Sequence, residues 1–292
     1  MIPLTRIRTA PPVHANFFGA KRTAVNLKLL KQKRDGKLEA AGEKKWDSGF
    51  WKESKDQLLA ETHDKCAYCE TPTKVVTYGD VEHFRPKSVY WWLAYSYENY
   101  LASCAICNQK YKKDFFQLAD DTLRISGPVV DDLTDAQLKT LARTLTVDPV
   151  KNATGKELQE LISDLKAENA LLINPYFDDP VISLAYRPIL ENKEVLVIPT
   201  APEFKLVVAA CEELFGVNRK ELLDLRFQWY CFYMTMKHTL EDGGISANTR
   251  LMNQNRLIQM TAAKSAYAGM IRYLETVPLA ELPWDFNIQI DL

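Results

Sequence analysis

Two C-x-x-C pairs frame the stretch of this sequence that is richest in residues able to do chemistry. Cys66 and Cys69 form the first pair, and Cys104 and Cys107 form the second. Each pair offers two thiolates from one tight turn, and four thiolates are a common donor set for a structural Zn²⁺ ion. The 34 residues between the pairs are more than a zinc ribbon usually encloses, so we expect this segment to carry secondary structure of its own.

Carboxylate, imidazole and amide side chains stand between the two pairs and directly after the second. They are Glu82, His83, Asn99 and Asn108. Hydrolysis of a phosphodiester needs a base that takes a proton from water and a cation that offsets the charge on the leaving 3′ oxygen. We predict that His83 is the base, that Asn99 fixes its loop, and that Glu82 and Asn108 hold a catalytic Mg²⁺ or Mn²⁺. Mg²⁺ keeps several waters, so one carboxylate and one amide oxygen suffice.

This pattern resembles the HNH endonucleases of the ββα-metal class in their zinc-knuckle form. The matching residues are Cys66, Cys69, Glu82, His83, Pro86, Asn99, Cys104, Cys107, Asn108 and Lys110. The local sequence Val-Glu-His-Phe-Arg-Pro-Lys at residues 81–87 is similar to that of HNH subunits associated with retrons and with Septu-type anti-phage systems. The resemblance implies a metal-dependent endonuclease that acts as the effector of a prokaryotic defence system. It also implies a separate ABC- or SMC-type ATPase as the regulating partner.

One residue departs from the family pattern, because many HNH proteins carry Asp where this chain has Glu82. Asp80 lies two residues earlier and would share a face with Glu82 on a strand. Asp80 is therefore a second candidate for the metal-binding carboxylate. The alternative for the whole chain is a catalytically inactive, zinc-stabilised module that binds nucleic acid or holds a partner.

Cations near the predicted site indicate where a nucleic acid would bind. Arg85 and Lys87 flank His83, and Lys110 and Lys113, or Lys112, follow the second knuckle. Residues 1–60 are basic, with 13 Lys and Arg against 6 Asp and Glu, whereas the residues after 113 hold 17 against 26. The basic end is the natural side for a polyanion. A one-metal site attacks phosphate and reads no base, so DNA, which we favour, and RNA both remain candidate substrates.

The elements that position these residues follow from the patterns of the sequence. A β-rich segment at residues 74–84 should place Glu82 and His83 at a strand end, and a helix over 105–115 should carry Asn108. Residues 1–20 are rich in proline and should run extended over the surface. The other predicted elements are helices over 21–37, 48–63, 133–145, 154–169, 203–215, 219–240 and 249–276, and a hairpin of 181–186 with 194–198.

The predicted fold class is α+β and mostly helical, with a ββα-metal core and its C-x-x-C/C-x-x-C zinc site flanked by helices. We divide the chain into a basic helical extension at 1–60, the nuclease core at 61–118, and a mainly helical region at 119–292. That last region is acidic, and we expect its helices to dock a partner. No run of about 18 apolar residues and no signal peptide is evident, so we expect a cytoplasmic protein without a membrane partner.

Overall fold

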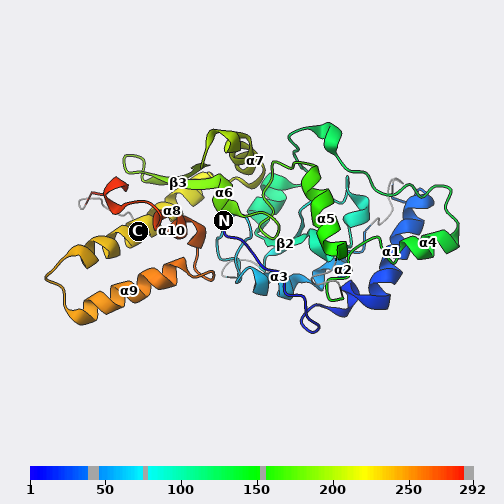
Figure 1. Ribbon diagram of the computed structural model, residues 1–292, viewed down its shortest axis with the longest axis horizontal. Helices are drawn as coiled ribbons and strands as arrows, with labels where there is room; N and C mark the ends of the chain where they lie inside the picture. Colours follow the sequence, from blue (N-terminus) through cyan, green and yellow to red (C-terminus); the bar gives the residue numbers. More distant parts are fainter. Residues whose placement is uncertain (39–45, 75–77, 152–155, 286–292) are drawn as a thin grey trace.

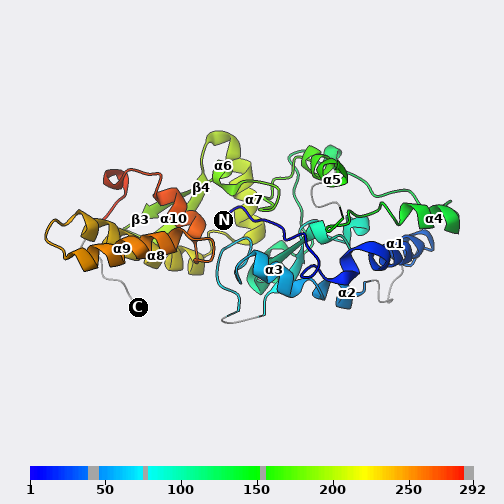
Figure 2. The same ribbon diagram turned by 60° about the horizontal axis from the view of Figure 1, so that its bottom comes forward.

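The computed structural model describes residues 1–38, 46–74, 78–151 and 156–285 of the chain. The molecule is elongated. At one end lie α1 (Gly19–Arg34) and α4 (Asp135–Leu141), and at the other lie α8 (Lys220–Glu241) and α9 (Ala247–Thr261) (Figures 1 and 2). Helices dominate, and the described residues form two antiparallel sheets of two strands each. The expected α+β, mostly helical class is thereby confirmed.

The first sheet lies between the two cysteine pairs. Strand β1 (Asp80–His83) pairs with β2 (Tyr100–Ser103), so that His83 stands opposite Tyr100. Helix η4 (Ile106–Lys112) follows at once and is a π-helix. The chain thus runs strand, strand, helix through the region where a ββα unit was expected. Both expected elements are shorter than predicted: Gly79, at a φ of +65°, precedes the strand, and residues 75–77 lie outside the described residues.

Helices and a hairpin surround this unit. Two of the expected helices are broken: residues 48–63 form two helices separated by Glu53 and Ser54, and residues 249–276 form two helices separated by an irregular segment that ends at Tyr267, whose φ is +52°. Thr154, at the start of another expected helix, lies outside the described residues. The remaining α-helices and strands of the described residues are α2 (Ser48–Lys52), α3 (Lys55–Glu61), α5 (Lys156–Ala167), α6 (Pro180–Ser183), β3 (Leu184–Ile189), β4 (Glu194–Pro199), α7 (Lys205–Phe215) and α10 (Ala268–Leu274). None of the described helices has the length and hydrophobicity that crossing a bilayer requires.

Packing crosses both of the boundaries drawn from the sequence. Phe17, from the N-terminal region, packs against Tyr97 with ring centroids 5.4 Å apart. Tyr68, in the first knuckle, stacks on Phe215 of α7 at 3.8 Å. The three regions therefore share hydrophobic contacts, and their division into separate domains stays a prediction.

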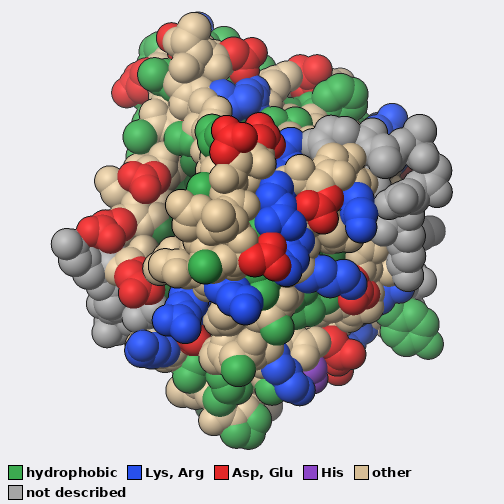
Figure 3. Space-filling view, turned by 90° about the vertical axis from the view of Figure 1, so that its right-hand side faces the viewer, with side chains coloured by type: hydrophobic (Ala, Val, Ile, Leu, Met, Phe, Trp, Pro, Cys, Tyr) green, Lys and Arg blue, Asp and Glu red, His purple; other side chains and the backbone are tan. Residues whose placement is uncertain are grey.

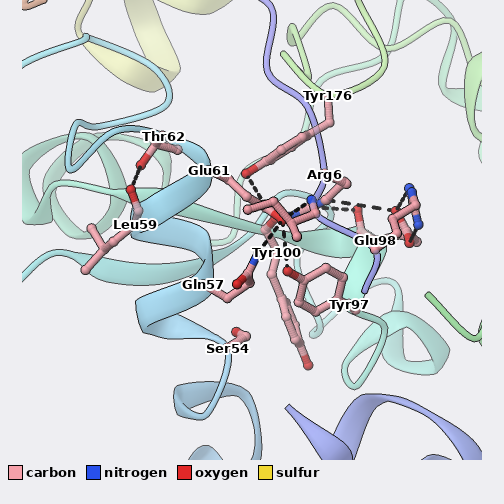
Figure 4. Close-up of polar contacts among 12 residues, drawn as sticks. Arg6, Ser54, Gln57, Leu59, Glu61, Thr62, Tyr97, Glu98, Tyr100 and Tyr176 are labelled. Carbon is pink, nitrogen blue, oxygen red and sulfur yellow. Dashed lines mark hydrogen bonds and ion pairs between the residues drawn. The ribbon is translucent and has the colours of Figure 1, made fainter. Parts of the chain in front are cut away.

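The N-terminal segment is anchored inside the molecule at several residues, whereas most of residues 1–20 are partly or fully exposed, as a course over the surface predicts. Met1 and Ile2 are buried, and Arg6 binds the carboxylate of Glu61 on α3 at 3.0 Å. The hydroxyls of Tyr97 and Tyr176 donate to the same carboxylate at 3.0 and 2.7 Å (Figure 4). A buried charge is tolerated where it is paired and hydrogen-bonded. This cluster ties the N-terminal segment to the residues just before β2.

The end of the molecule that carries α1 is rich in cations. Figure 3 shows this end, where Lys and Arg side chains gather across the middle and lower part of the visible surface, with some Asp and Glu among them. Helix α1 contributes Lys28, Lys31, Lys33 and Arg34. Lys31 and Arg34 pair with Asp135 at the start of α4, at 2.5 and 2.7 Å. Part of the basic face is therefore neutralised within the chain.

Candidate functional site

The four cysteines of the two pairs converge at one point. Their sulfur atoms all lie within 4.8 Å of one another, and Cys69 Sγ is 3.9 Å from Cys104 Sγ. Tetrahedral Zn²⁺ with Zn–S bonds of about 2.3 Å places its sulfurs roughly 3.8 Å apart. Cys66, Cys69 and Cys107 are buried, while Cys104 is half-buried. The donor set and its spacing therefore fit a structural zinc ion.

Electrostatics also favour a cation at the cysteine cluster. Hydrogen bonds from the neighbouring thiols, Cys104 first, hold the pKa of Cys69 well below its usual value, whereas burial raises the pKa of Cys66. Four thiols this close cannot all carry charge unless a cation compensates them. Arg219 supplies one positive group from outside the cluster, since its Nη1 lies 3.5 Å from Cys107 Sγ. Cys211 and Cys231 are buried elsewhere, as expected of plain core thiols.

His83 is held in a defined tautomer. Its Nε2 lies 3.0 Å from the carbonyl oxygen of Ala94, which can only accept, so Nε2 carries the proton. Nδ1 of the neutral ring is then left as the basic nitrogen. Burial, followed by the charge of Lys87, lowers the pKa of His83 to about 3, so the ring is neutral at physiological pH. The rings of Trp51 and Tyr100 meet the imidazole edge-on at 4.9 and 5.0 Å.

Glu82 is a buried carboxylate that faces one fixed cation. Lys112 Nζ lies 2.5 Å from its Oε1, and the Lys112 side chain is wholly buried. No residue of the described chain gives that oxygen a hydrogen bond of acceptable geometry, so the contact is an ion pair alone. Burial raises the pKa of Glu82 although Lys112 acts in the opposite direction. Lys112 thus holds Oε1, and a carboxylate oxygen is a ligand type that Mg²⁺ prefers, so Oε2 is the one to consider for a metal.

Asn108 and Asp80 meet at the edge of the same region. Asp80 Oδ2 accepts hydrogen bonds from Asn108 Nδ2 at 3.2 Å and from Gln109 Nε2 at 2.9 Å. The carbonyl oxygen of the Asn108 side chain is thereby directed away from Asp80 and stays available as a ligand. Asp80 is engaged by two amides, whereas Glu82 lines the cleft described below.

Asn99 spans the loop that follows His83. Its Oδ1 accepts from the backbone amide of Arg85 at 2.8 Å, and its Nδ2 donates to the Arg85 carbonyl at 2.9 Å. Two bonds to one residue fix the chain direction just after His83. These are the contacts that a loop-fixing amide would make, and they keep Asn99 away from the cleft.

A cleft of about 270 Å³ brings several predicted residues together. Its lining residues are Trp51, Val81, Glu82, His83, Pro86, Lys87, Asn108, Gln109, Lys113 and Asp114. The base candidate, the metal-ligand candidates Glu82 and Asn108, and two of the predicted phosphate-binding lysines therefore share one opening, whose lining does not include Asp80. Lys110 is exposed on η4 but does not line the cleft.

Arg85 is a correction to the sequence prediction. Its guanidinium is buried, donates to Glu168 Oε2 at 2.7 Å through Nε, and donates to the Leu165 carbonyl at 2.7 Å through Nη2. A buried and paired guanidinium cannot reach phosphate without breaking these bonds. Lys112, the other alternative for a phosphate contact, is buried in the pair with Glu82.

Sequence reasoning missed three residues that lie beside His83 or in the cleft. Trp51 comes from α2, a helix that precedes the first knuckle, and Lys87 Nζ lies 5.6 Å from the centre of its ring. Gln109 and Asp114 flank Asn108 and Lys113 along the chain. Gln109 and Asp114 could have been predicted, because each is adjacent in sequence to a predicted site residue. Nothing in the sequence places Trp51 at the site. The aromatic residues Tyr90, Tyr95, Tyr97 and Tyr100 of this region are buried, so they serve packing and do not stack on bases.

One characterised relative gives a partial match. The chain is 30% identical over 155 residues to the Septu protein PtuB of Bacillus mycoides (strain KBAB4). The match covers 48% of this chain and 41% of that protein, so the chain spans less than half the length of the relative. No family model and no solved structure matches the chain.

Proposed function

We propose that this protein is a metal-dependent HNH endonuclease that hydrolyses phosphodiester bonds of nucleic acid. One observation carries the proposal: a neutral imidazole with a fixed tautomer, His83, lines the same cleft as the oxygen ligands Glu82 and Asn108. General base, metal site and phosphate-binding lysines are the parts that such a hydrolysis needs. The order strand, strand, helix behind the cleft is compatible with a ββα-metal core.

His83 would act on water. The bond from Nε2 to Ala94 leaves Nδ1 to accept a proton, so a water beside it gains nucleophilic character as it attacks phosphorus. The bond between phosphorus and the 3′ oxygen then breaks, the leaving oxygen takes up a proton from solvent to become a hydroxyl, and the proton taken by Nδ1 returns to solvent. Because the ring is neutral at physiological pH, it needs no prior deprotonation.

Glu82 and Asn108 would hold the catalytic Mg²⁺ or Mn²⁺. Bound there, the ion would offset the negative charge that develops on the leaving oxygen. Lys112 would orient Glu82 from the interior of the protein, because the ion pair fixes Oε1 and leaves Oε2 for the metal. The zinc site would fix the start of η4, on which Asn108 follows Cys107 directly.

Lys87 and Lys113 are the cations that we expect to contact phosphate. Both line the cleft, and Lys110 extends the positive surface along η4. Ammonium groups attract the backbone without reading sequence. DNA remains the favoured substrate and RNA the other candidate.

The test is a cleavage assay with purified protein. Supercoiled plasmid, single-stranded DNA and RNA are each incubated with Mg²⁺, with Mn²⁺ or with EDTA. We expect cleavage in the presence of the divalent ion and no cleavage in the presence of EDTA. Binding without cleavage of any of the three, in the presence of either ion, would favour the alternative of an inactive zinc-stabilised binding or scaffolding module.

We further propose a role as the effector of a prokaryotic anti-phage system, together with a separate ABC- or SMC-type ATPase. The support is the similarity to the Septu protein PtuB. A free nuclease would damage its host, so restraint by a partner is expected. Co-expression with an ATPase encoded beside this chain, followed by size-exclusion chromatography, tests this: failure to co-elute would count against it.

A further inference from the structure

Helices α8 and α9 form an arm at the end of the molecule remote from α1 (Figures 1 and 2). In α9 Met260 is buried, and no other described residue of its 15 is. Leu251, Met252 and Ile258 are 55%, 60% and 67% exposed. A helix with this much apolar surface in water is typical of a binding element that has not met its partner.

A groove of about 940 Å³ runs between the two helices. Its apolar lining comes from Trp229, Phe232 and Met236 of α8 and from Met252 and Met260 of α9. Phe232 is 49% exposed, so the apolar surface reaches the opening. Methionine is flexible and polarisable and adapts its shape to an inserted side chain.

The segment that contains α9 carries charge of one sign, which no carboxylate within the segment compensates. Residues 243–274 contain no Asp or Glu but four cations, Arg250, Arg256, Lys264 and Arg272. Arg250 donates to the Leu240 and Asp242 carbonyls, Arg272 donates to the Thr261 carbonyl, and Arg256 donates to the Gln259 side chain. Within the described parts of the chain, none of the four pairs with a carboxylate. Arg256 and Lys264 line the groove itself.

We propose that the groove binds an amphipathic helix of another protein, one with apolar residues on its inner face and Asp or Glu on its flanks. Its apolar face would cover Phe232, Met252 and the residues below them. Its carboxylates would meet Arg256 and Lys264 at the rim. This is helix-in-groove recognition, with apolar anchors at a spacing of i, i+3, i+4 and i+7.

Two other occupants fit the groove less well. A second copy pairing through α9 would bring Arg250 and Arg256 against their own counterparts, and like charges across an interface are unfavourable. A nucleic acid would leave the apolar floor of the groove unused, because its backbone is bound by rows of cations. The complementary charge therefore selects an acidic helix.

The experiment is a display selection against the full-length protein. The library presents 18-residue helices with Leu, Ile, Phe or Met at i, i+3, i+4 and i+7 and with Glu, Gln or Lys, randomly chosen, at the flanking positions. We expect Glu to be enriched at the flanks. A synthetic peptide of the enriched sequence should bind at least about tenfold more weakly to Phe232→Glu, which corresponds to about 1.4 kcal/mol.

Matched variants make the outcome decisive. Leu225→Glu, on α8 but outside the groove, should bind like the parent chain, and Met252→Glu repeats the test should Phe232→Glu fail to fold. The double variant Arg256→Glu/Lys264→Glu should turn the selection toward Lys. Flanks rich in Lys with the parent chain, or no enrichment at all, would overturn the proposal. Two further results would overturn it. One is binding of a 20-base-pair duplex that Phe232→Glu abolishes, and the other is self-association in sedimentation equilibrium that the same variant abolishes.

Discussion

The ammonium group of Lys112 lies 2.5 Å from Oε1 of Glu82, inside the protein and behind the candidate cleft. The same Nζ donates to the backbone carbonyl of His83 at 3.0 Å. One buried cation therefore holds the carboxylate and the backbone of two consecutive residues. Because η4 carries both Lys112 and Asn108, this contact also fixes the helix relative to β1.

Replacing Lys112 by Met should destabilise the fold. The change leaves Glu82 as a buried carboxylate without its cation, which typically costs about 3–5 kcal/mol in free energy of unfolding. Urea unfolding of the zinc-loaded protein measures the loss. Lys113→Met, one residue away and exposed, should change the free energy by less than about 0.5 kcal/mol.

A second variant separates the ion pair from simple packing. Glu82→Gln combined with Lys112→Met removes both charges, so the double variant should be more stable than Lys112→Met alone. If the loss in free energy of unfolding for the double variant equals the sum of the losses for Glu82→Gln and Lys112→Met, the two charges do not interact.

The burial of Lys112 is a feature that could not be predicted from the sequence. Lys110, Lys112 and Lys113 look alike in the sequence, yet Lys112 is buried and the other two are exposed. The wider turn of a π-helix decides which lysine faces inward, and a period of 3.6 residues does not reveal it. Arg85 failed as a phosphate contact for a related reason, since its partner Glu168 lies 83 residues away. The convergence of the four cysteines was predictable, because their spacing reflects a local and strongly constrained geometry.

The helices and the N-terminal segment show the same contrast between features that local sequence determines and features that distant residues determine. Helix α1 and the β3–β4 hairpin have local patterns, and both occur close to where they were expected. The burial of Arg6 within the N-terminal segment depends on Glu61, Tyr97 and Tyr176, which are distant in sequence. Local propensity could not reveal a segment that is held by tertiary ion pairs.

His83→Ala should abolish cleavage while leaving the fold and the zinc content unchanged. A positioned general base contributes roughly 10²–10⁴ in rate, so the loss should be at least a hundredfold. His83→Gln is the companion variant, because its amide can still donate to Ala94 but cannot accept a proton as imidazole does. His63→Asn, at an exposed position outside the cleft lining, serves as the control. Full turnover by folded His83→Gln protein would remove His83 from the mechanism.

The two carboxylate candidates can be distinguished by Mn²⁺ binding, measured by electron paramagnetic resonance without any substrate. Glu82 lines the cleft with Asn108, whereas Asp80 already accepts from two amides. We expect Glu82→Gln and Asn108→Ala to weaken Mn²⁺ binding at least about tenfold, and Asp80→Asn to weaken it less. The reverse order would transfer the ligand role to Asp80.

Elemental analysis should find one zinc ion per chain. Cys66→Ser or Cys104→Ser should yield insoluble or protease-sensitive protein, because a structural zinc ion contributes about 10 kcal/mol or more to the folding of a small domain. Cys211→Ala, at a buried thiol outside the cluster, should keep the full zinc content. A well-folded and active preparation without zinc would contradict the assignment of the four cysteines.

Glu61→Gln tests whether the polar cluster around Arg6 holds the N-terminal segment in place. Glu61 is fully buried and accepts from Arg6, Tyr97, Tyr176 and the backbone amide of Ile7. The neutral amide keeps the shape but leaves the buried guanidinium without its nearest carboxylate, which typically costs about 3–5 kcal/mol. Urea unfolding gives the total loss, and hydrogen exchange should show faster exchange at the amides of Leu4 and Ile7. Glu53→Gln, at an exposed position, should change the unfolding free energy by less than about 0.5 kcal/mol. If both variants unfold at the same urea concentration as the parent chain, the cluster does not stabilise this segment.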